Sequence, residues 1–184
     1  KIPVPYIIDI SPINTQGDYI LTDIQSGLWR CHFELKGHKI VLTSLIKLKL
    51  PRIGFIQQMQ SGRIYIAGED LSYYDDEVSA FKKVCRLPGA WQYATINQML
   101  EDENHKLWIT ADQLGVLRIN LRQPEEIEFL QQGKNTPSTF FDAIEDHAGG
   151  IWTISYYGLH RISSVMKIYN YQQRELKNIT PQSM

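Results

Sequence analysis

The chain of 184 residues has little cysteine, no excess of charge of either sign and no long apolar run. Its two cysteines, Cys31 and Cys85, are too few for a disulfide framework or a four-ligand zinc site, and the sequence assigns neither a role. Nineteen basic residues stand against twenty acidic ones, so no long-range field attracts nucleic acid or an anionic membrane. No segment approaches the roughly 20 apolar residues that span a bilayer. We therefore expect neither nucleic acid nor a membrane as a direct partner of this segment.

The sequence signatures of catalysis and cofactor binding are also absent. No Gly-x-Ser-x-Gly nucleophile elbow occurs, and neither of the glycine-rich phosphate-binding patterns is present. His105, His147 and His160 are spread along the chain rather than clustered as metal ligands are. We therefore predict that this segment is not an enzyme and has no catalytic residue, no metal site and no cofactor.

What is present is the composition of an ordinary folded protein, with 43% apolar and 21% charged residues. The length fits one domain. Because the chain begins at Lys1 rather than Met, we expect a piece of a longer protein. The length is also four times 46, which makes internal repetition the next feature to test.

Two copies of one repeat are clear in the second half of the chain. They run from Ile96 to Ile119 and from Phe140 to Ile162. Each has a segment that ends in Glu-Asp, then a turn, then a strand with Trp108 or Trp152, and then Gly-x-x-Arg. The two tryptophans are 44 residues apart.

The same frame extends backwards to two weaker copies, in which Tyr65 and Tyr19 take the place of the tryptophans. The four aromatic markers are then spaced 46, 43 and 44 residues apart. A strand about twelve residues upstream of each marker recurs near Ile7, Ile53, Ile96 and Phe140. The predicted repeats are residues 1–50, 51–93, 94–137 and 138–184.

Each repeat is typical of four short strands, which we name A to D in chain order. Strand B carries the aromatic marker, strand C follows Gly-Leu, and strand D alternates charged with apolar residues, as an outer strand with one wet face does. Four-stranded units of about 40 to 50 residues predict β-propeller blades. We therefore predict an all-β fold of four consecutive four-stranded antiparallel blades.

The recurring acids belong to the turn between strands A and B. Glu101-Asp102 and Glu145-Asp146 are paired carboxylates of the kind that general acid–base catalysts use. Their recurrence at one position of the repeat favours a structural role, in which the Asp accepts hydrogen bonds from turn amides.

The series Glu-Asp, Leu-Trp-Ile-Thr or Ile-Trp-Thr-Ile, and Gly-x-x-Arg in residues 96–119 and 140–162 resembles the two-component regulator propeller repeat. That repeat forms the periplasmic sensor regions of bacterial hybrid histidine kinases and related signalling proteins, which carry many more copies. The resemblance implies an incomplete propeller, an open arc whose partners are the remaining blades of the parent. It implies a periplasmic location but does not specify the ligand, which we hypothesise to be a nutrient. Uncovered blade flanks predict a homodimer or poor solubility.

The candidate ligand-binding residues lie in loops that share one rim of a propeller. Trp91 and Tyr93 belong to the linker before the third repeat, and the turns between strands B and C carry further candidates: Asp112, Gln113, Tyr156 and Tyr157, with Asp23, Gln25, Glu69 and Asp70 in the earlier repeats. Aromatic side chains beside amides and carboxylates suit an oligosaccharide. The alternative is that these are ordinary loop residues and that the ligand binds elsewhere.

Two other functions are consistent with a propeller. One is a hydrolase or lyase that resembles streptogramin lyases, which place a histidine and acids on the rim. We disfavour it because the rim candidates include acids but no histidine. The other is a protein-interaction scaffold, which an export signal in the parent would argue against.

Overall fold

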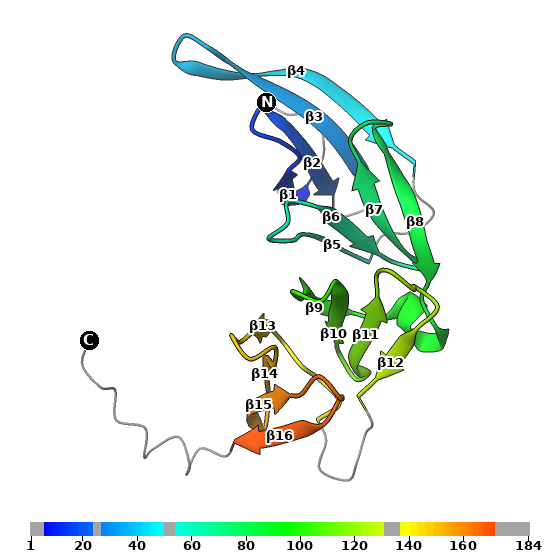
Figure 1. Ribbon diagram of the computed structural model, residues 1–184. Helices are drawn as coiled ribbons and strands as arrows, with labels where there is room; N and C mark the ends of the chain where they lie inside the picture. Colours follow the sequence, from blue (N-terminus) through cyan, green and yellow to red (C-terminus); the bar gives the residue numbers. More distant parts are fainter. Residues whose placement is uncertain (1–5, 24–26, 50–53, 131–136, 172–184) are drawn as a thin grey trace, which may run out of the picture. The chain divides into compact units, whose positions relative to one another are not determined.

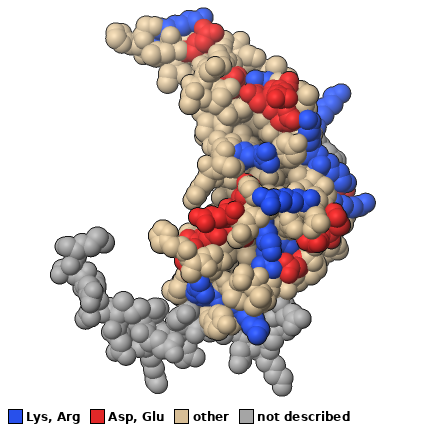
Figure 2. Space-filling model, in the orientation of Figure 1, with Lys and Arg blue, Asp and Glu red and all other residues tan. Residues whose placement is uncertain are grey.

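Two compact units, residues 1–93 and 94–184, make up the computed structural model of the chain. It describes residues 6–23, 27–49, 54–130 and 137–171. Within these residues the chain forms four four-stranded antiparallel sheets and one short 3-10 helix (Figure 1). Each sheet is a meander in chain order, which confirms the predicted all-β class and the four-stranded repeats. Figure 2 shows basic and acidic side chains interspersed on the face in view.

Unit 1 contains blades 1 and 2 and the 3-10 helix. The strands of blade 1 are β1 (Ile7–Pro12), β2 (Asp18–Asp23), β3 (Leu28–Lys36) and β4 (Lys39–Leu48). Those of blade 2 are β5 (Phe55–Gln58), β6 (Ile64–Ala67), β7 (Asp70–Asp75) and β8 (Ala80–Arg86). The helix η1 (Gly89–Tyr93) follows blade 2.

Unit 2 contains blades 3 and 4. The strands of blade 3 are β9 (Ile96–Glu101), β10 (Lys106–Ala111), β11 (Gly115–Asn120) and β12 (Ile127–Phe129). Those of blade 4 are β13 (Ala143–Glu145), β14 (Ile151–Ser155), β15 (Gly158–Ile162) and β16 (Ile168–Tyr171). The predicted open arc concerns all four blades together and stays a prediction.

Burial falls from the inner strands to the outer strand of a blade. All four residues of β6 are buried, and β10 and β11 each bury five of their six residues, because both faces of these inner strands are covered. The outer strands β8 and β12 contain no buried residue. Their charged side chains keep the open edge in water and discourage pairing with other chains, as the sequence predicted.

The core of unit 2 lies between its two blades. Trp108 and Val116 of blade 3 form one cluster with Phe140, Ala143 and Ile151, all at most 3% exposed. Burial of each large apolar side chain in such a cluster stabilises the fold by about 1.5–3 kcal/mol. The aromatic marker of strand B therefore packs against the next blade.

The marker of the first repeat is Ile20, and the prediction of Tyr19 was wrong by one residue. Ile20 pairs across the sheet with Arg30, as Trp108 pairs with Arg118. A shift of one residue turns a strand side chain to the other face. Accordingly Ile20 is 1% exposed, whereas Tyr19 is only partly buried.

The turn between strands A and B supports the same assignment. Asn14 accepts the amides two and four residues on in blade 1, as Asp102 does in blade 3, and Ile20 and Trp108 each follow six residues later. The backbone bond of the blade 1 turn starts one residue earlier, from the amide of Ile13 to the carbonyl of Asp18. Gly17 lies in this turn with a φ of 97°. A Cβ at Gly17 would collide with a backbone carbonyl, so the turn depends on glycine.

Candidate ligand-binding rim

Loops from successive blades meet at one edge of unit 2. The turn between β10 and β11 bonds the linker that leads into blade 4. The amide of Gly115 donates to the carbonyl of Ser138 at 2.7 Å, and the amide of Gln113 donates to Thr139 Oγ1 at 3.1 Å. Thr139 Oγ1 in turn donates to Asp112 Oδ1 at 2.6 Å. These bonds fix the B–C turn and the linker beside each other, as the repeat predicted.

The rim continues into the turn between β14 and β15. The amide of Phe141 donates to the carbonyl of Ile154 at 3.0 Å, and its ring meets Tyr156 edge to face at 4.7 Å. Tyr156 is 81% exposed and its neighbour Tyr157 is 79% exposed. Two aromatic side chains therefore project into solvent from a turn that backbone bonds hold in place.

A buried histidine supports this turn. His160 is 2% exposed, and its Nε2 lies 2.6 Å from Ser155 Oγ. The same oxygen accepts a hydrogen bond from the amide of Tyr157 at 3.0 Å. The imidazole also packs edge to face on Phe140, with the ring centroids 5.5 Å apart. The tyrosines are therefore presented on a rigid base.

The structure brings four of the six predicted residues together. Asp112, Gln113, Tyr156 and Tyr157 lie on one strip, which residues 139–141 connect. We call this strip the unit 2 rim and define it as residues 112–113, 138–141 and 155–157. Gln25 lies outside the described residues.

The other two predicted residues belong to unit 1, in η1. Trp91 is only 5% exposed, so its indole offers almost no surface to a ligand. Tyr93, two residues on, is 62% exposed. The short helix explains the difference, because the Trp91 amide bonds the carbonyl of Pro88 and Gln92 Nε2 bonds that of Leu87, which turns the indole inwards.

Sequence reasoning missed the histidine at the rim. His160 lies within strand C, in β15, where the register puts it opposite Thr153 and its side chain reaches Ser155 at the B–C turn. The signal was available, because a two-residue turn pairs Ser155 with Gly158 and brings the side chain of His160 next to Ser155.

The recurring aspartates hold their turns, as predicted. Asp146 Oδ1 accepts the amide of Gly150 at 2.8 Å, and its Oδ2 accepts Trp152 Nε1 at 2.8 Å and Arg161 Nε at 2.7 Å. These donors hold the pKa of the Asp146 carboxyl well below its ordinary range, the arginine contributing most. Burial raises the pKa of the neighbouring Glu145. A carboxylate that accepts hydrogen bonds from all these donors is a structural group rather than a proton-transfer group.

Neither metal nor thiol chemistry is indicated in the part of the chain that the structure describes. It contains no group of three His, Cys, Asp or Glu residues that could hold a metal ion. Burial raises the pKa of both Cys31 and Cys85 to about 11, so their thiols stay protonated at neutral pH.

No helix in the described ranges is long and apolar enough to cross a membrane.

No family model and no curated protein matches the sequence. Solved structures do match the fold. The extracellular domain of the hybrid two component system BT3049 from B. thetaiotaomicron aligns with 84% of this chain at 18% identity and a TM-score of 0.58. That of the hybrid system BT4673 from the same organism aligns with 93% at 15% identity and a TM-score of 0.61. The chain has a β-propeller fold.

The propeller fold is shared with other proteins. The WD40 domain of SCAP from fission yeast aligns with 95% of this chain at 12% identity and a TM-score of 0.53. The chain spans 20% and 25% of the two extracellular domains and 48% of the yeast domain. At these identities the likeness concerns the fold. The repeat recognised in the sequence is confirmed at that level, since its predicted relatives are among the matches.

Proposed function

We propose that this propeller segment is part of the extracytoplasmic, periplasmic sensor region of a bacterial signal-transduction protein such as a hybrid histidine kinase, and that its unit 2 rim binds an oligosaccharide nutrient. The observation that carries the proposal is the pair Tyr156 and Tyr157, exposed on a turn that His160 and Ser155 hold rigid. The fold of the sensor domains it resembles supports the signalling part.

The chemistry of the rim fits a sugar. The faces of tyrosine rings stack on the apolar faces of pyranose rings, while hydroxyl, amide and carboxylate groups bond the sugar hydroxyls. Exposed Gln113 and Ser138 lie along the same strip and supply an amide and a hydroxyl. A rigid platform loses little conformational entropy on binding, which favours a usable affinity.

Binding is favoured over catalysis because the ionisable groups beside the rim already have structural partners. Asp112 accepts the hydroxyl of Thr139, and His160 Nε2 faces Ser155 inside the protein. These contacts argue against the lyase-like alternative. The further blades of the parent, and a second copy of the chain, are the protein partners that we propose.

Isothermal titration calorimetry against a panel of oligosaccharides tests the binding proposal. We expect at least one to bind, and Tyr156→Ala and Tyr157→Ala each to weaken it about tenfold through loss of stacking. Tyr169→Ala is the matched control, because Tyr169 is half exposed on the outer strand β16, away from the rim. Equal affinities of all three variants, or no binding of any oligosaccharide, would refute the proposal.

The signalling part has a separate test in the gene. We expect the open reading frame around these 184 residues to encode more copies of the repeat, a transmembrane helix and a signalling output. A reading frame without a transmembrane helix and without any output domain would refute a sensor, whatever the rim binds.

A further inference from the structure

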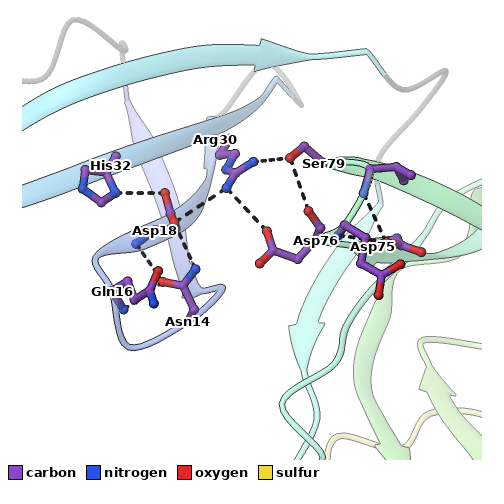
Figure 3. Close-up of polar contacts among 10 residues, drawn as sticks. Asn14, Gln16, Asp18, Arg30, His32, Asp75, Asp76 and Ser79 are labelled. Atoms are coloured by element: carbon purple, nitrogen blue, oxygen red, sulfur yellow. Dashed lines mark hydrogen bonds and ion pairs between the residues drawn. The ribbon is translucent and has the colours of Figure 1, made fainter.

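The arginine of Gly-x-x-Arg crosses to the next blade in unit 1. Arg30 on β3 donates through Nη1 to Ser79 Oγ and through Nη2 to Asp76 Oδ1, the latter at 3.4 Å (Figure 3). Ser79 and Asp76 lie in the turn between β7 and β8 of blade 2. The arginine of blade 1 thus binds the C–D turn of blade 2.

The equivalent arginine does the same in unit 2. Arg118 on β11 donates through Nη1 to the carbonyl of Ser164 at 2.5 Å, in the turn between β15 and β16 of blade 4. The separation in sequence is 46 residues, as it is between Arg30 and Asp76. Two blade pairs therefore use the same arginine of the motif and the same turn of the next blade.

Each arginine also binds a carboxylate of its own blade. Arg118 donates through Nε to Glu128 at 2.7 Å and stacks on Trp108 at 4.9 Å, while Arg30 pairs with Asp18 at 3.6 Å. Arg118 is only 3% exposed. A buried guanidinium loses its hydrogen bonds to water and needs other acceptors for its N–H groups. An oxygen of the next blade therefore offsets part of the free-energy cost of burying the arginine.

Blade 4 repeats the arrangement at Arg161. This residue pairs across the sheet with Trp152, as Arg118 does with Trp108, and it holds Asp146 through Nε and Nη2. We propose that the motif arginine is a latch between consecutive blades. Arg161 accordingly makes the flank of blade 4 a binding surface for one further blade of this repeat, whose C–D turn presents a carbonyl, hydroxyl or carboxylate oxygen about 46 residues after it.

Charge decides which kind of blade fits this flank. The acceptors that bind Arg30 and Arg118 are neutral or acidic oxygens. The C–D turn of blade 1 carries Lys36, His38 and Lys39 instead, so it would repel Arg161. A second copy stacked through its blade 1 is therefore the wrong partner. Blade 2 has Tyr73 in place of the arginine and carries no latch of this kind.

The chain itself contains a blade with a suitable turn, which allows a direct test. A second copy of residues 51–93 is joined after residue 181, so that the copied Asp76 follows Arg161 by 46 residues, as the native Asp76 follows Arg30. Thermal unfolding temperatures are then measured for three variants of this extended chain. The first carries Arg161→Met, the second carries Asp76→Asn and Ser79→Ala in the copied blade, and the third carries all of these changes. The same three combinations at Arg30, Asp76 and Ser79 of the unextended chain calibrate the result.

A latch predicts that the combined variant unfolds at about the temperature of the worse single variant, because both changes remove one interaction. It also predicts that Arg161→Met leaves any self-association of the unextended chain, measured by sedimentation, unchanged. The inference would be overturned if the changes in unfolding temperature were additive for the Arg161 variants but not for the Arg30 variants. It would also be overturned if the appended blade did not fold together with the rest of the chain. Self-association of the unextended chain that Arg161→Met abolishes would assign the flank to a second copy instead. None of these outcomes depends on a ligand at the rim.

Discussion

At the scale of single residues, the acceptor in the turn between strands A and B and the marker of strand B change together from blade to blade. In blade 3, Asp102 accepts turn amides with Oδ1 and Trp108 Nε1 with Oδ2. In blade 1, Asn14 accepts the amides of Gln16 and Asp18, and Ile20 stands in the tryptophan position. The side chain of isoleucine has no N–H that needs an acceptor, so a neutral amide suffices where blade 3 needs a carboxylate.

Asp146→Asn tests the carboxylate. Because the folded protein lowers the pKa of Asp146 below its ordinary 3.8, its contribution to stability is complete above that pH and is lost as the pH falls below it. We expect the variant to unfold at a lower temperature at pH 7 and to lose part of the acid sensitivity between pH 4 and pH 2. Circular dichroism melts across this range measure both.

Glu145→Gln is the matched control for that experiment. Burial raises the pKa of Glu145, so its charge costs stability in the folded state and the neutral amide removes that cost. The control should not lower the unfolding temperature at pH 7. A loss equal to that of Asp146→Asn would show that the turn tolerates no change, rather than that the charge matters.

The two thiols offer a second test at this scale. With pKa values of about 11, Cys31 and Cys85 have little thiolate at pH 8. We expect alkylation by iodoacetamide to be slow in the native protein and to accelerate at least tenfold in denaturant. Rapid modification of native protein, read by mass spectrometry, would contradict the burial of these side chains.

At the scale of strands, the repeat predicted which segments pair but not the register of β2. Period and turn chemistry are local, so the four strands of each blade could be found from the sequence. The marker of β2 was misassigned because Tyr19 and Ile20 are both apolar and the period of the repeat alone favours neither. The turn glycine carried the missing signal, since Gly17 stands three residues before Ile20, as Gly149 does before Trp152. Likewise, the burial of Trp91 depends on the helix η1, whose bonds to Pro88 and Leu87 leave no sequence period.

Ile20→Ala compared with Tyr19→Ala tests this register. Ile20 is 1% exposed within the core of unit 1, so truncation should cost about 2–5 kcal/mol. Tyr19 is partly exposed and meets Phe33 edge to face at 5.6 Å, so its truncation should cost less. Urea denaturation gives both values. The reverse order would restore Tyr19 as the marker of the first repeat.

At the scale of the whole molecule, the residues that stabilise the fold and the residues expected to bind a ligand lie in different parts of each blade. Strands B and C and the A–B turn carry the core, the aspartate bonds and the arginine contacts that repeat along the chain. The rim loops differ between blades, and only the loop of blade 4 presents two adjacent exposed tyrosines among the described residues. Repeated positions explain stability, and the positions that break the repeat are where a ligand is expected.

Hydrogen exchange of the whole chain, with and without the best-binding oligosaccharide of the panel, tests the central claim most directly. The account predicts that the sugar slows amide exchange at residues 112–113, 138–141 and 155–157 and leaves the outer strands β8, β12 and β16 unchanged. Slowed exchange confined to the outer strands or to the C–D turns, with the rim unaffected, would contradict it.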